Sequence, residues 1–264
     1  MNKNILITGA ASGIGKATTE ILLNKEYNVF AIDIVECEPH NNLKSFICDI
    51  TNDEQISMVI NYFKINNIKI DAIINVAGIH KMTSLVENNF NDLKKLIDIN
   101  LLGTMNVNNK FHPYLEKNGK IIIVTSEVAP FDPLPFNGLY NVSKTALDSY
   151  AQALRQELNL LNQKVITIRP GSIKTPLSDG SLTDTAKLSN NTILYKKQAN
   201  KFLKLTKKFM GKTVSPKKVG NLIVKIIEKK NPKIIYRINL NILLSLLNLL
   251  PKRIQCFIIK KILN

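Results

Sequence analysis

Short apolar runs alternate with longer amphipathic stretches over most of the chain. The runs at residues 5–7 and 28–33 are rich in Ile, Val and Phe, and their length and composition are typical of buried strands. Five further runs of this kind predict strands at residues 43–48, 71–75, 120–125, 165–168 and 233–236. Between the runs, apolar residues recur at three- and four-residue steps, which indicates helices. The expected helices cover residues 16–25, 54–65, 90–115, 140–161, 195–210 and 216–230.

Strands that alternate with helices predict an α/β fold. The expected architecture is a Rossmann-type, doubly wound parallel sheet of about seven strands with helices on both faces, a three-layer αβα sandwich. In such a sheet the ligands bind at the carboxyl ends of the strands. Residues found at those ends are therefore the candidates for function.

A glycine-rich segment, T-G-A-A-S-G-I-G at residues 8–15, stands between the first strand and the first helix. This order places backbone N–H groups and a helix N-terminus where a pyrophosphate can bind. We expect Gly9 to allow the tight turn, Gly13 to let a cofactor approach and Gly15 to let the helix pack closely. Asp33 ends the second strand, where a carboxylate binds the adenosine ribose hydroxyls and would repel a 2′-phosphate. The sequence therefore predicts NAD rather than NADP, unless Asp33 is merely a turn residue.

Tyr140 and Lys144 lie four residues apart at the start of a predicted helix, so their side chains share one face. A phenol has a pKa near ~10, and a fixed cation beside it favours the phenolate. A downward shift of roughly two to three units in the Tyr140 pKa would suit a general acid or base. The alternative for any single pair of this kind is a surface tyrosine beside a solvated lysine.

Other polar residues follow the remaining strands. Asp49 follows the third strand, Asn75 and Gly78 the fourth, and Ser126 the fifth. The segment P-G-S-I-K-T at residues 170–175 follows the sixth. Because parallel strands end at one edge of the sheet, we expect these residues to converge on one cleft.

Together these residues resemble the short-chain dehydrogenase/reductase family over about residues 4–236. Two positions depart from its pattern, Val76 in place of a second Asn and Pro130 where a Gly is usual. The resemblance rests on T-G-x-x-x-G-x-G at residues 8–15, N-x-A-G at 75–78, Asn100, Ser126, Y-x-x-x-K at 140–144 and P-G-x-x-x-T at 170–175. Taken alone, Asn100 would be a cap or a packing hydrogen bond.

The resemblance implies hydride transfer between nicotinamide C4 and a carbonyl or carbinol carbon. Tyr140 would be the acid/base, and Ser126 would orient the substrate oxygen. Lys144 would lower the tyrosine pKa and hold the nicotinamide ribose, while Asn100 would hold the water that links Lys144 to solvent. Thr175 would bind the carboxamide. The implied cofactor contacts are Gly9, Ser12, Gly13, Ile14, Gly15, Asp33, Asp49, Ile50, Asn75, Ala77, Gly78, Tyr140, Lys144, Pro170, Gly171, Ile173 and Thr175.

The substrate implied by the resemblance is a small-molecule alcohol or ketone. Residues 135–140 are similar to the branch that acts on steroids, retinoids and other lipophilic alcohols, and residues 175–215 occupy the place of the substrate lid. An acyl-like substrate, including an acyl-carrier or coenzyme A thioester, would suit the basic end of the chain. The alternative is a non-catalytic, nucleotide-sensing protein of the same fold, which would not need Asn100, Ser126, Tyr140 and Lys144 together. A homodimer or homotetramer is also implied.

Length and charge divide the chain unevenly. The 264 residues, 45% of them hydrophobic, predict one nucleotide-binding catalytic domain over residues 1–237 and a helical extension over 238–264. The formal charge of +16 resides in residues 187–264, which hold 19 Lys and Arg against one acid, Glu228. That end is expected to face anions. Aromatic residues form only 6% of the chain and no recognition motif is present, so nucleic acid is not the expected partner.

The scattered cysteines and histidines predict neither a disulfide framework nor a metal site. Residues before the first strand do not form a signal sequence, and a cytoplasmic location is the expectation. The apolar run at residues 240–250 is too short to span a bilayer. In residues 254–263 apolar and basic side chains occupy opposite sides: Ile254, Phe257, Ile258 and Ile262 against Arg253, Lys260 and Lys261. These helices either lie on a membrane surface or pack in protein, over the substrate entrance or between subunits.

Overall fold

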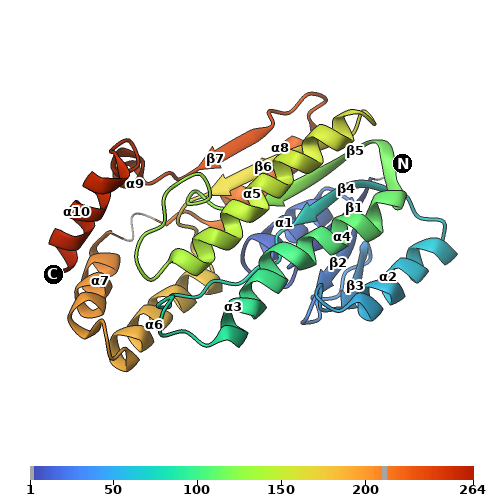
Figure 1. Cartoon of the computed structure of the whole chain (residues 1–264). Coiled ribbons are helices and arrows are strands. Elements are labelled where there is room, and N and C mark those ends of the chain that lie inside the picture. Colours follow the sequence, from blue (N-terminus) through green and yellow to red (C-terminus); the bar gives the residue numbers. More distant parts are fainter. Residues whose placement is uncertain (1–2, 210–212) are drawn as a thin grey trace.

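The computed structural model describes residues 3–209 and 213–264 and shows a seven-stranded sheet between two layers of helices (Figure 1). The order of the strands is β3-β2-β1-β4-β5-β6-β7, and every neighbouring pair is parallel. The strands are β1 (Asn4–Thr8), β2 (Asn28–Asp33), β3 (Leu43–Ile47), β4 (Ile70–Asn75), β5 (Leu115–Val124), β6 (Lys164–Pro170) and β7 (Ile235–Ile238). The doubly wound parallel sheet predicted from the sequence is confirmed.

The apolar runs form the centre of this sheet because both faces are covered. Almost every residue of β1, β4 and the second half of β5 is buried, as expected where helices lie on both sides. At the edge, β3 is half exposed, which agrees with its mixed polar and apolar sequence.

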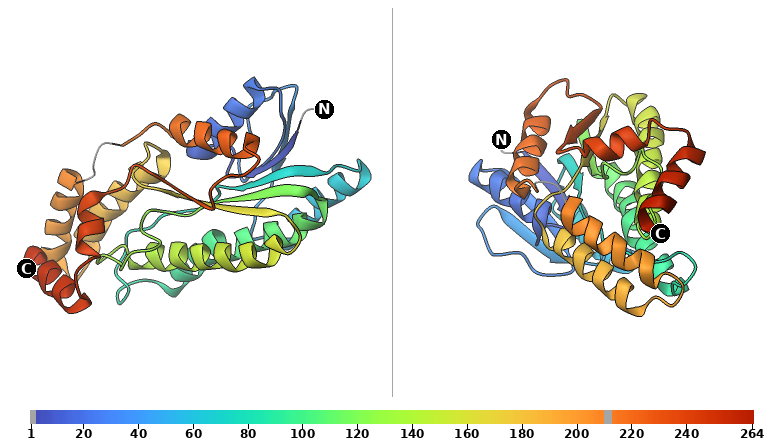
Figure 2. Two further views of the ribbon diagram at one scale, coloured as in Figure 1. Left: turned by 90° about the horizontal axis from the view of Figure 1, so that it is seen from above. Right: turned by 90° about the vertical axis from the view of Figure 1, so that its left-hand side faces the viewer.

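Helices cover the two faces of the sheet. On one face α1 (Gly13–Asn24) and α8 (Pro216–Glu228) pack against the strands. The other face is covered by α2 (Asp53–Ile65), α4 (Thr104–Phe111) and α5 (Gly138–Asn159). The view from above shows the three layers, with the blue and orange helices on one side of the sheet and the green and yellow ones on the other (Figure 2, left).

The long helix expected at residues 90–115 is interrupted. The chain forms α3 (Phe90–Ile97), a π-helical turn η1 (Asp98–Gly103), α4 and a short 3₁₀ turn η2 (His112–Tyr114). Gly103 lies against Ile50, because a Cβ at this glycine would come within 2.7 Å of Ile50 Cγ1. The wide turn therefore fits between neighbouring elements, and π turns of this kind are frequent at functional sites.

The segment expected to be the substrate lid contains two helices, α6 (Pro176–Asn191) and α7 (Lys196–Phe209). Only the second was expected, at residues 195–210, and Met210 lies outside the described residues. The first begins with a capping box between Thr175 and Ser178, with a proline at its first position. Those signals start a helix without a strong apolar stripe, so the periodic pattern did not reveal it.

After β7 the chain continues into α9 (Ile242–Leu247) and α10 (Lys252–Leu263). Leu263 and Ile259 of α10 pack with Phe202 of α7 and with Phe136, which precedes α5. The lid and the last two helices thus gather at one end of the molecule (Figures 1 and 2). Within residues 3–209 and 213–264, no helix is both long and apolar enough to cross a membrane.

Candidate active site

A cleft of about 590 Å³ opens at the carboxyl edge of the sheet and is lined by strand ends, the first turn of α1 and the start of α6. Three residues expected in the site, Gly15, Asn75 and Asn100, do not line it. The expected residues that do are Gly9, Ser12, Gly13, Ile14, Asp33, Asp49, Ile50, Ala77, Gly78, Ser126, Tyr140, Lys144, Pro170, Gly171, Ile173 and Thr175. The structure therefore brings together nearly all of the predicted site.

The glycine turn after β1 is packed too closely against its neighbours to accept side chains at two positions. Gly9 has a φ of +68°, and a Cβ there would lie 2.7 Å from the backbone nitrogen of Ala77. A Cβ at Gly15 would lie 1.8 Å from Gly9 O, so the first turn of α1 packs directly on the loop. The turn and the first residues of α1 line the cleft, and together they form a cradle of backbone beside a helix N-terminus that fits the pyrophosphate of a dinucleotide.

Asp33 lies at the end of β2, at the rim of the same cradle. Its Oδ2 accepts a hydrogen bond from Ala11 N at 2.9 Å, and its Oδ1 accepts one from Val35 N at 3.2 Å. The carboxylate is thus held in place by backbone donors on both sides. Such a fixed anion suits ribose hydroxyls and opposes a phosphate.

Asn75 and Asn100 support the cleft from behind. Asn75 Nδ2 donates to Asn108 Oδ1 of α4 at 2.8 Å, and Asn75 is buried. Asn100, within η1, accepts from Ile79 N at 2.8 Å and donates to Ile79 O at 2.9 Å and to Ser143 Oγ at 3.0 Å. Its side chain therefore fastens the segment after β4 to α5. The water relay implied for Asn100 stays a prediction.

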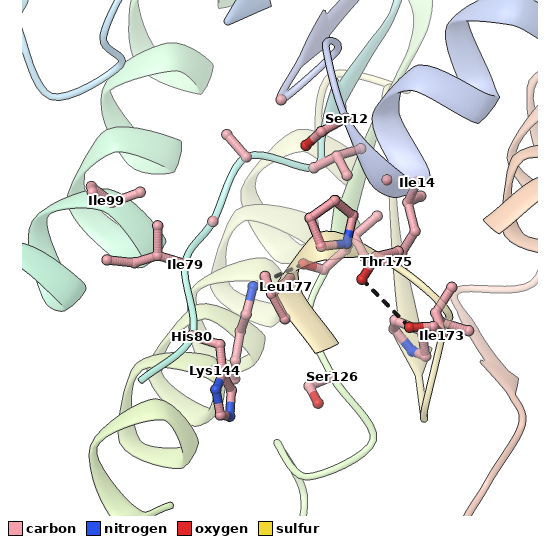
Figure 3. Close-up of a pocket in the computed structure, with 18 of the residues that line it drawn as sticks. Ser12, Ile14, Ile79, His80, Ile99, Ser126, Lys144, Ile173, Thr175 and Leu177 are labelled. Atoms are coloured by element: carbon pink, nitrogen blue, oxygen red, sulfur yellow. Dashed lines mark hydrogen bonds between the residues drawn. The ribbon is translucent and has the colours of Figure 1, made fainter. Parts of the chain in front are cut away.

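Ser126, Tyr140 and Lys144 lie at the inner end of the cleft. Ser126 follows β5, while the other two residues lie one turn apart at the start of α5 and are buried. Lys144 Nζ donates to Val124 O at 3.3 Å and stands 5.8 Å from the centre of the Tyr140 ring. Figure 3 shows Lys144 beside His80, with Ser126 to their right. A carbonyl oxygen placed here would meet two hydroxyl groups and a nearby amine.

Burial controls the protonation of this site. It raises the pKa of Tyr140 to about 12, the Glu127 charge adds to that rise, and the hydrogen bond with Ser126 opposes it. Burial also lowers the pKa of Lys144 to about 8. The downward shift of the Tyr140 pKa expected from the sequence is thus corrected. The physical reason is that loss of water disfavours both the phenolate and the ammonium.

Among the cleft residues that the sequence did not predict, His80 and Glu127 carry ionisable side chains near Tyr140. The His80 ring lies 4.4 Å from the Tyr140 ring, centre to centre, and His80 Nε2 is 3.1 Å from Asn137 Oδ1. Glu127 Oε2 accepts a hydrogen bond from Asn241 N at 2.7 Å, and burial raises its pKa. Their places in the sequence could have indicated them, because His80 lies two residues after the N-x-A-G motif and Glu127 directly follows Ser126.

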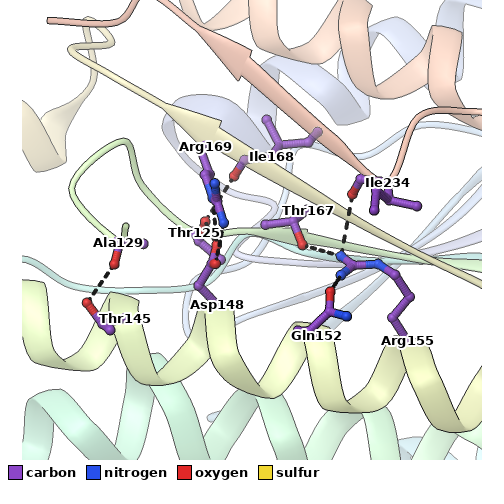
Figure 4. A network of polar contacts seen from close by, with 10 residues as sticks. All are labelled: Thr125, Ala129, Thr145, Asp148, Gln152, Arg155, Thr167, Ile168, Arg169 and Ile234. Carbon is purple, nitrogen blue, oxygen red and sulfur yellow. Dashed lines mark hydrogen bonds and ion pairs between the residues drawn. The ribbon is translucent and has the colours of Figure 1, made fainter. Parts of the chain in front are cut away.

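A buried ion pair fixes the strand ends beneath the site. Arg169 of β6 donates to Asp148 of α5 through Nε at 2.9 Å and Nη2 at 2.5 Å. Thr125 Oγ1 also donates to Asp148, at 3.2 Å. Further along α5, Arg155 donates to Thr167 Oγ1 at 2.7 Å (Figure 4). Since Thr125 precedes Ser126 and Arg169 precedes Pro170, this network sets the positions of two walls of the cleft.

The fold and cleft define a class of nicotinamide-dependent oxidoreductases, and comparison with known proteins places the chain within it. The family model described as short chain dehydrogenase matches residues 3–186. The chain is 28% identical over 230 residues to a 3-ketodihydrosphingosine reductase of Bacteroides thetaiotaomicron, which covers 86% of this chain and 84% of the relative. It is 32% identical over 189 residues to a 3-oxoacyl-[acyl-carrier-protein] reductase of Thermotoga maritima, with coverage of 67% and 76%.

A solved short chain dehydrogenase family protein from Francisella tularensis has a similar structure, with a TM-score of 0.75 and 26% identity. The match covers 90% of this chain and 96% of the other. The chain therefore belongs to the short-chain dehydrogenase family. It is an oxidoreductase of CH–OH and C=O groups that uses NAD(P).

Proposed function

We propose that the enzyme transfers a hydride between NAD(H) and the carbonyl or secondary alcohol of a lipophilic, acyl-like substrate, with Tyr140 as the acid/base. One observation carries this proposal. Ser126, Tyr140 and Lys144 occupy one end of a cleft whose other end is formed by the glycine turn and Asp33. A substrate oxygen at the first end and a dinucleotide at the second would meet in a single site.

Proton transfer is the part of the reaction that these residues perform. The nicotinamide, when bound, supplies or accepts the hydride at the reacting carbon. In the reducing direction the Tyr140 hydroxyl donates its proton to the carbonyl oxygen, and the Ser126 hydroxyl orients that oxygen. A pKa of about 12 keeps Tyr140 protonated at neutral pH, as a proton donor must be. Lys144 contributes positive charge at the same end of the cleft.

The preference for NAD rests on Asp33. Its carboxylate is fixed by the backbone of Ala11 and Val35, so it cannot turn away from a ligand without breaking both hydrogen bonds. A 2′-phosphate placed at this rim would meet a fixed negative charge, whereas ribose hydroxyls would find an acceptor. The cofactor contacts expected from the sequence remain part of this proposal.

A lipophilic substrate agrees with the walls beyond Tyr140. Leu177 of α6 lines the cleft, and Tyr195 and Phe202 of the lid form an apolar cluster with Phe136, which precedes α5. Two relatives are named for substrates with a keto group, a 3-ketodihydrosphingosine and a 3-oxoacyl chain. We infer that the lid helices hold the hydrocarbon part while the keto group reaches Ser126 and Tyr140.

Cofactor choice is tested by titrating the purified protein with NADH and NADPH and following nicotinamide fluorescence. We expect NADH to bind more tightly, and Asp33→Ala to reduce that preference by about tenfold or more, which is 1.4 kcal/mol or more of discrimination. Asp33→Asn is the matched variant, because it removes the charge and keeps the shape. Tighter binding of NADPH by the unmodified protein would overturn the NAD assignment.

Catalysis is tested by following NADH oxidation with long-chain 3-keto lipids and 3-oxoacyl thioesters dispersed in detergent. Tyr140→Phe is expected to lower kcat by at least about 10²-fold, because it removes the proton donor. NADH affinity should change little, which separates loss of chemistry from loss of folding. Full activity of Tyr140→Phe would refute the assigned role. Tight NADH binding with no turnover of any alcohol or ketone would instead favour the nucleotide-sensing alternative.

A further inference from the structure

The α9 helix and the turn after it expose a continuous apolar stripe. Ile242, Leu243, Leu246, Leu249 and Leu250 recur at the spacing of one helical face, and all of them are exposed. Leu249 is 79% exposed, a value typical of a side chain with almost no protein neighbours. A stripe of large aliphatic side chains on a surface marks an interaction site.

The α10 helix exposes a second apolar surface although one of its sides is already packed. Ile259 and Leu263 face the lid, and Gln255 is buried with them. On the other side Phe257 is 65% exposed, and Ile254 is exposed near it on the same helical face. The sequence predicted apolar and basic residues on opposite sides of this helix. In the structure part of the apolar side is exposed, and Arg253, Lys260 and Lys261 are exposed as well.

The part of the chain that carries these apolar side chains is strongly basic in sequence, and among its neighbours Asp132 pairs with Lys252 of α10. Residues 187–264 contain 19 Lys and Arg and a single acid, whereas residues 1–186 contain 17 Lys and Arg and 19 acids. The single acid of residues 187–264, Glu228 at the end of α8, forms an ion pair with Lys25. Asn264 at the end of α10 accepts a hydrogen bond from Gln198 of the lysine-rich α7 at 2.8 Å. The lysines of α7 and α10 therefore belong to the same end of the molecule (Figure 2, right).

We propose that this docking face, the exposed apolar side chains of residues 242–257 with the basic residues of α7 and α10, binds an anionic lipid surface. Apolar side chains would enter the boundary between headgroups and acyl chains, while Lys and Arg meet lipid phosphates. The helices are short, so the enzyme lies on the surface and does not span it.

Charge distinguishes a lipid surface from a second copy of the chain. A two-fold contact places the same patch of both copies face to face, so each copy would bring its own lysines against those of its partner. Like charges opposed in this way disfavour the contact. An anionic bilayer offers acyl chains to the apolar stripe and negatively charged headgroups to the basic residues.

Docking would place the lid next to the lipid. Because α10 packs on α7, a surface that contacts α10 lies directly beside the lid that covers the substrate end of the cleft. A lipophilic substrate could then enter from the bilayer without passing through water. This consequence rests on the proposed function, whereas the docking itself does not.

The experiment is co-sedimentation of the full chain with vesicles, which reads binding and not activity. One set contains phosphatidylcholine alone, and a second contains about 30% phosphatidylglycerol. We expect binding to the anionic vesicles only, and a partial loss of it at about 1 M salt, where the Debye length falls to ~3 Å. A partial loss is expected because the apolar contacts are not screened.

Paired variants locate the surface. Leu249→Asn with Phe257→Asn is expected to lower the partition coefficient by about tenfold or more, because two exposed apolar side chains that would enter the lipid are lost. Lys260→Gln with Lys261→Gln should also lower the partition coefficient, and by a larger factor in low salt than in high salt. The matched controls, Ile65→Asn with Leu160→Asn and Lys64→Gln with Lys117→Gln, change exposed residues far from the docking face and should bind as the unmodified protein does.

Two results would overturn the proposal. The first is a failure of the intact protein to sediment with anionic vesicles in low salt, or equal losses in the docking-face and control variants. The second is a dimer or tetramer that Leu249→Asn with Phe257→Asn converts to monomers, without vesicle binding by the unmodified protein. That outcome would show that another copy covers this face. Nucleotide titration on the same samples keeps either failure separate from failure of the proposed function.

Discussion

Burial sets the properties of the two ionisable residues at the reacting end of the cleft. Tyr140 and Lys144 are both held away from water, so the Tyr140 pKa is about 12 and the Lys144 pKa is about 8. Lys144 has one backbone acceptor, Val124 O, and no acidic side chain contributes to its pKa shift. A buried lysine without an acidic partner lowers the stability of the fold, and such residues are typical of functional sites.

Replacing this lysine should therefore stabilise the protein while abolishing activity. The folded-state pKa of Lys144 lies below its ordinary value of 10.5, so the cost of burying its charge is complete below pH 8 and vanishes by about pH 10.5. We expect Lys144→Met to raise the free energy of unfolding by about 1–3 kcal/mol at pH 7. Urea unfolding of the cofactor-free proteins between pH 7 and about pH 10.5 should show that the difference in unfolding free energy between the variant and the unmodified protein shrinks as the pH rises. A variant less stable than the unmodified protein at pH 7 would contradict this account.

Glu127 acts on the same tyrosine through its charge. Its carboxylate raises the pKa of Tyr140 and also accepts the Asn241 N–H at 2.7 Å. Glu127→Gln keeps an acceptor for that hydrogen bond but removes the charge. In the oxidising direction, the rising limb of kcat against pH should move to lower pH, by up to about one unit. An unmoved limb, or a shift to higher pH, would exclude an electrostatic role for Glu127.

At the scale of elements, the ion pair between α5 and β6 holds the cleft together. Both side chains are mostly buried, with exposed fractions of 10% for Arg169 and 17% for Asp148. Asp148→Ala leaves the guanidinium buried without its partner and should cost about 3–5 kcal/mol of unfolding free energy. Arg169→Met combined with Asp148→Ala should cost clearly less than the sum of the single changes. Urea unfolding of the four proteins tests this, and additive losses would show that the pair is not coupled.

Sequence reasoning located most elements because their burial pattern is regular. The strand at residues 28–33 has the observed bounds of β2, and the expected helix at 140–161 differs from α5 by two residues at each end. The π turn at Asp98–Gly103 was missed because it depends on how Gly103 meets Ile50, a contact between distant segments. Local periodicity cannot report such a contact.

The candidate site shows the same division. Glycines and strand-end residues could be placed because a parallel sheet brings its carboxyl ends together. His80 and Glu127 could not, since their importance depends on the ring of Tyr140 and on Asn241, which the sequence does not place beside them. The pKa of Tyr140 was expected to fall because spacing shows a charged neighbour, while burial becomes visible only in the structure.

At the scale of the whole molecule, the last two helices lie outside the sandwich, and α10 packs against the lid. The division into a catalytic domain at residues 1–237 and an extension at 238–264 stays a prediction. Several contacts join these parts. The Asn241 N–H donates to Glu127, the Asp132 N–H donates to Asn248, and Ile259 and Leu263 pack in the apolar cluster with Phe202 of the lid. None of these contacts involves the glycine turn or Asp33.

Deleting residues 241–264 should therefore separate the two functions of the cleft. The sheet, the glycine turn and Asp33 keep their contacts, so NADH affinity should remain within about threefold, a change of under 1 kcal/mol. Phe202 loses Leu263 as a neighbour, so α7 should exchange its amide hydrogens faster and KM for a long-chain keto lipid should rise. Leu263→Ala is the milder version and should shift both readouts in the same direction, because it removes only this contact. Collapse of NADH binding in the deletion variant would instead show that residues 241–264 are an integral part of the nucleotide-binding domain.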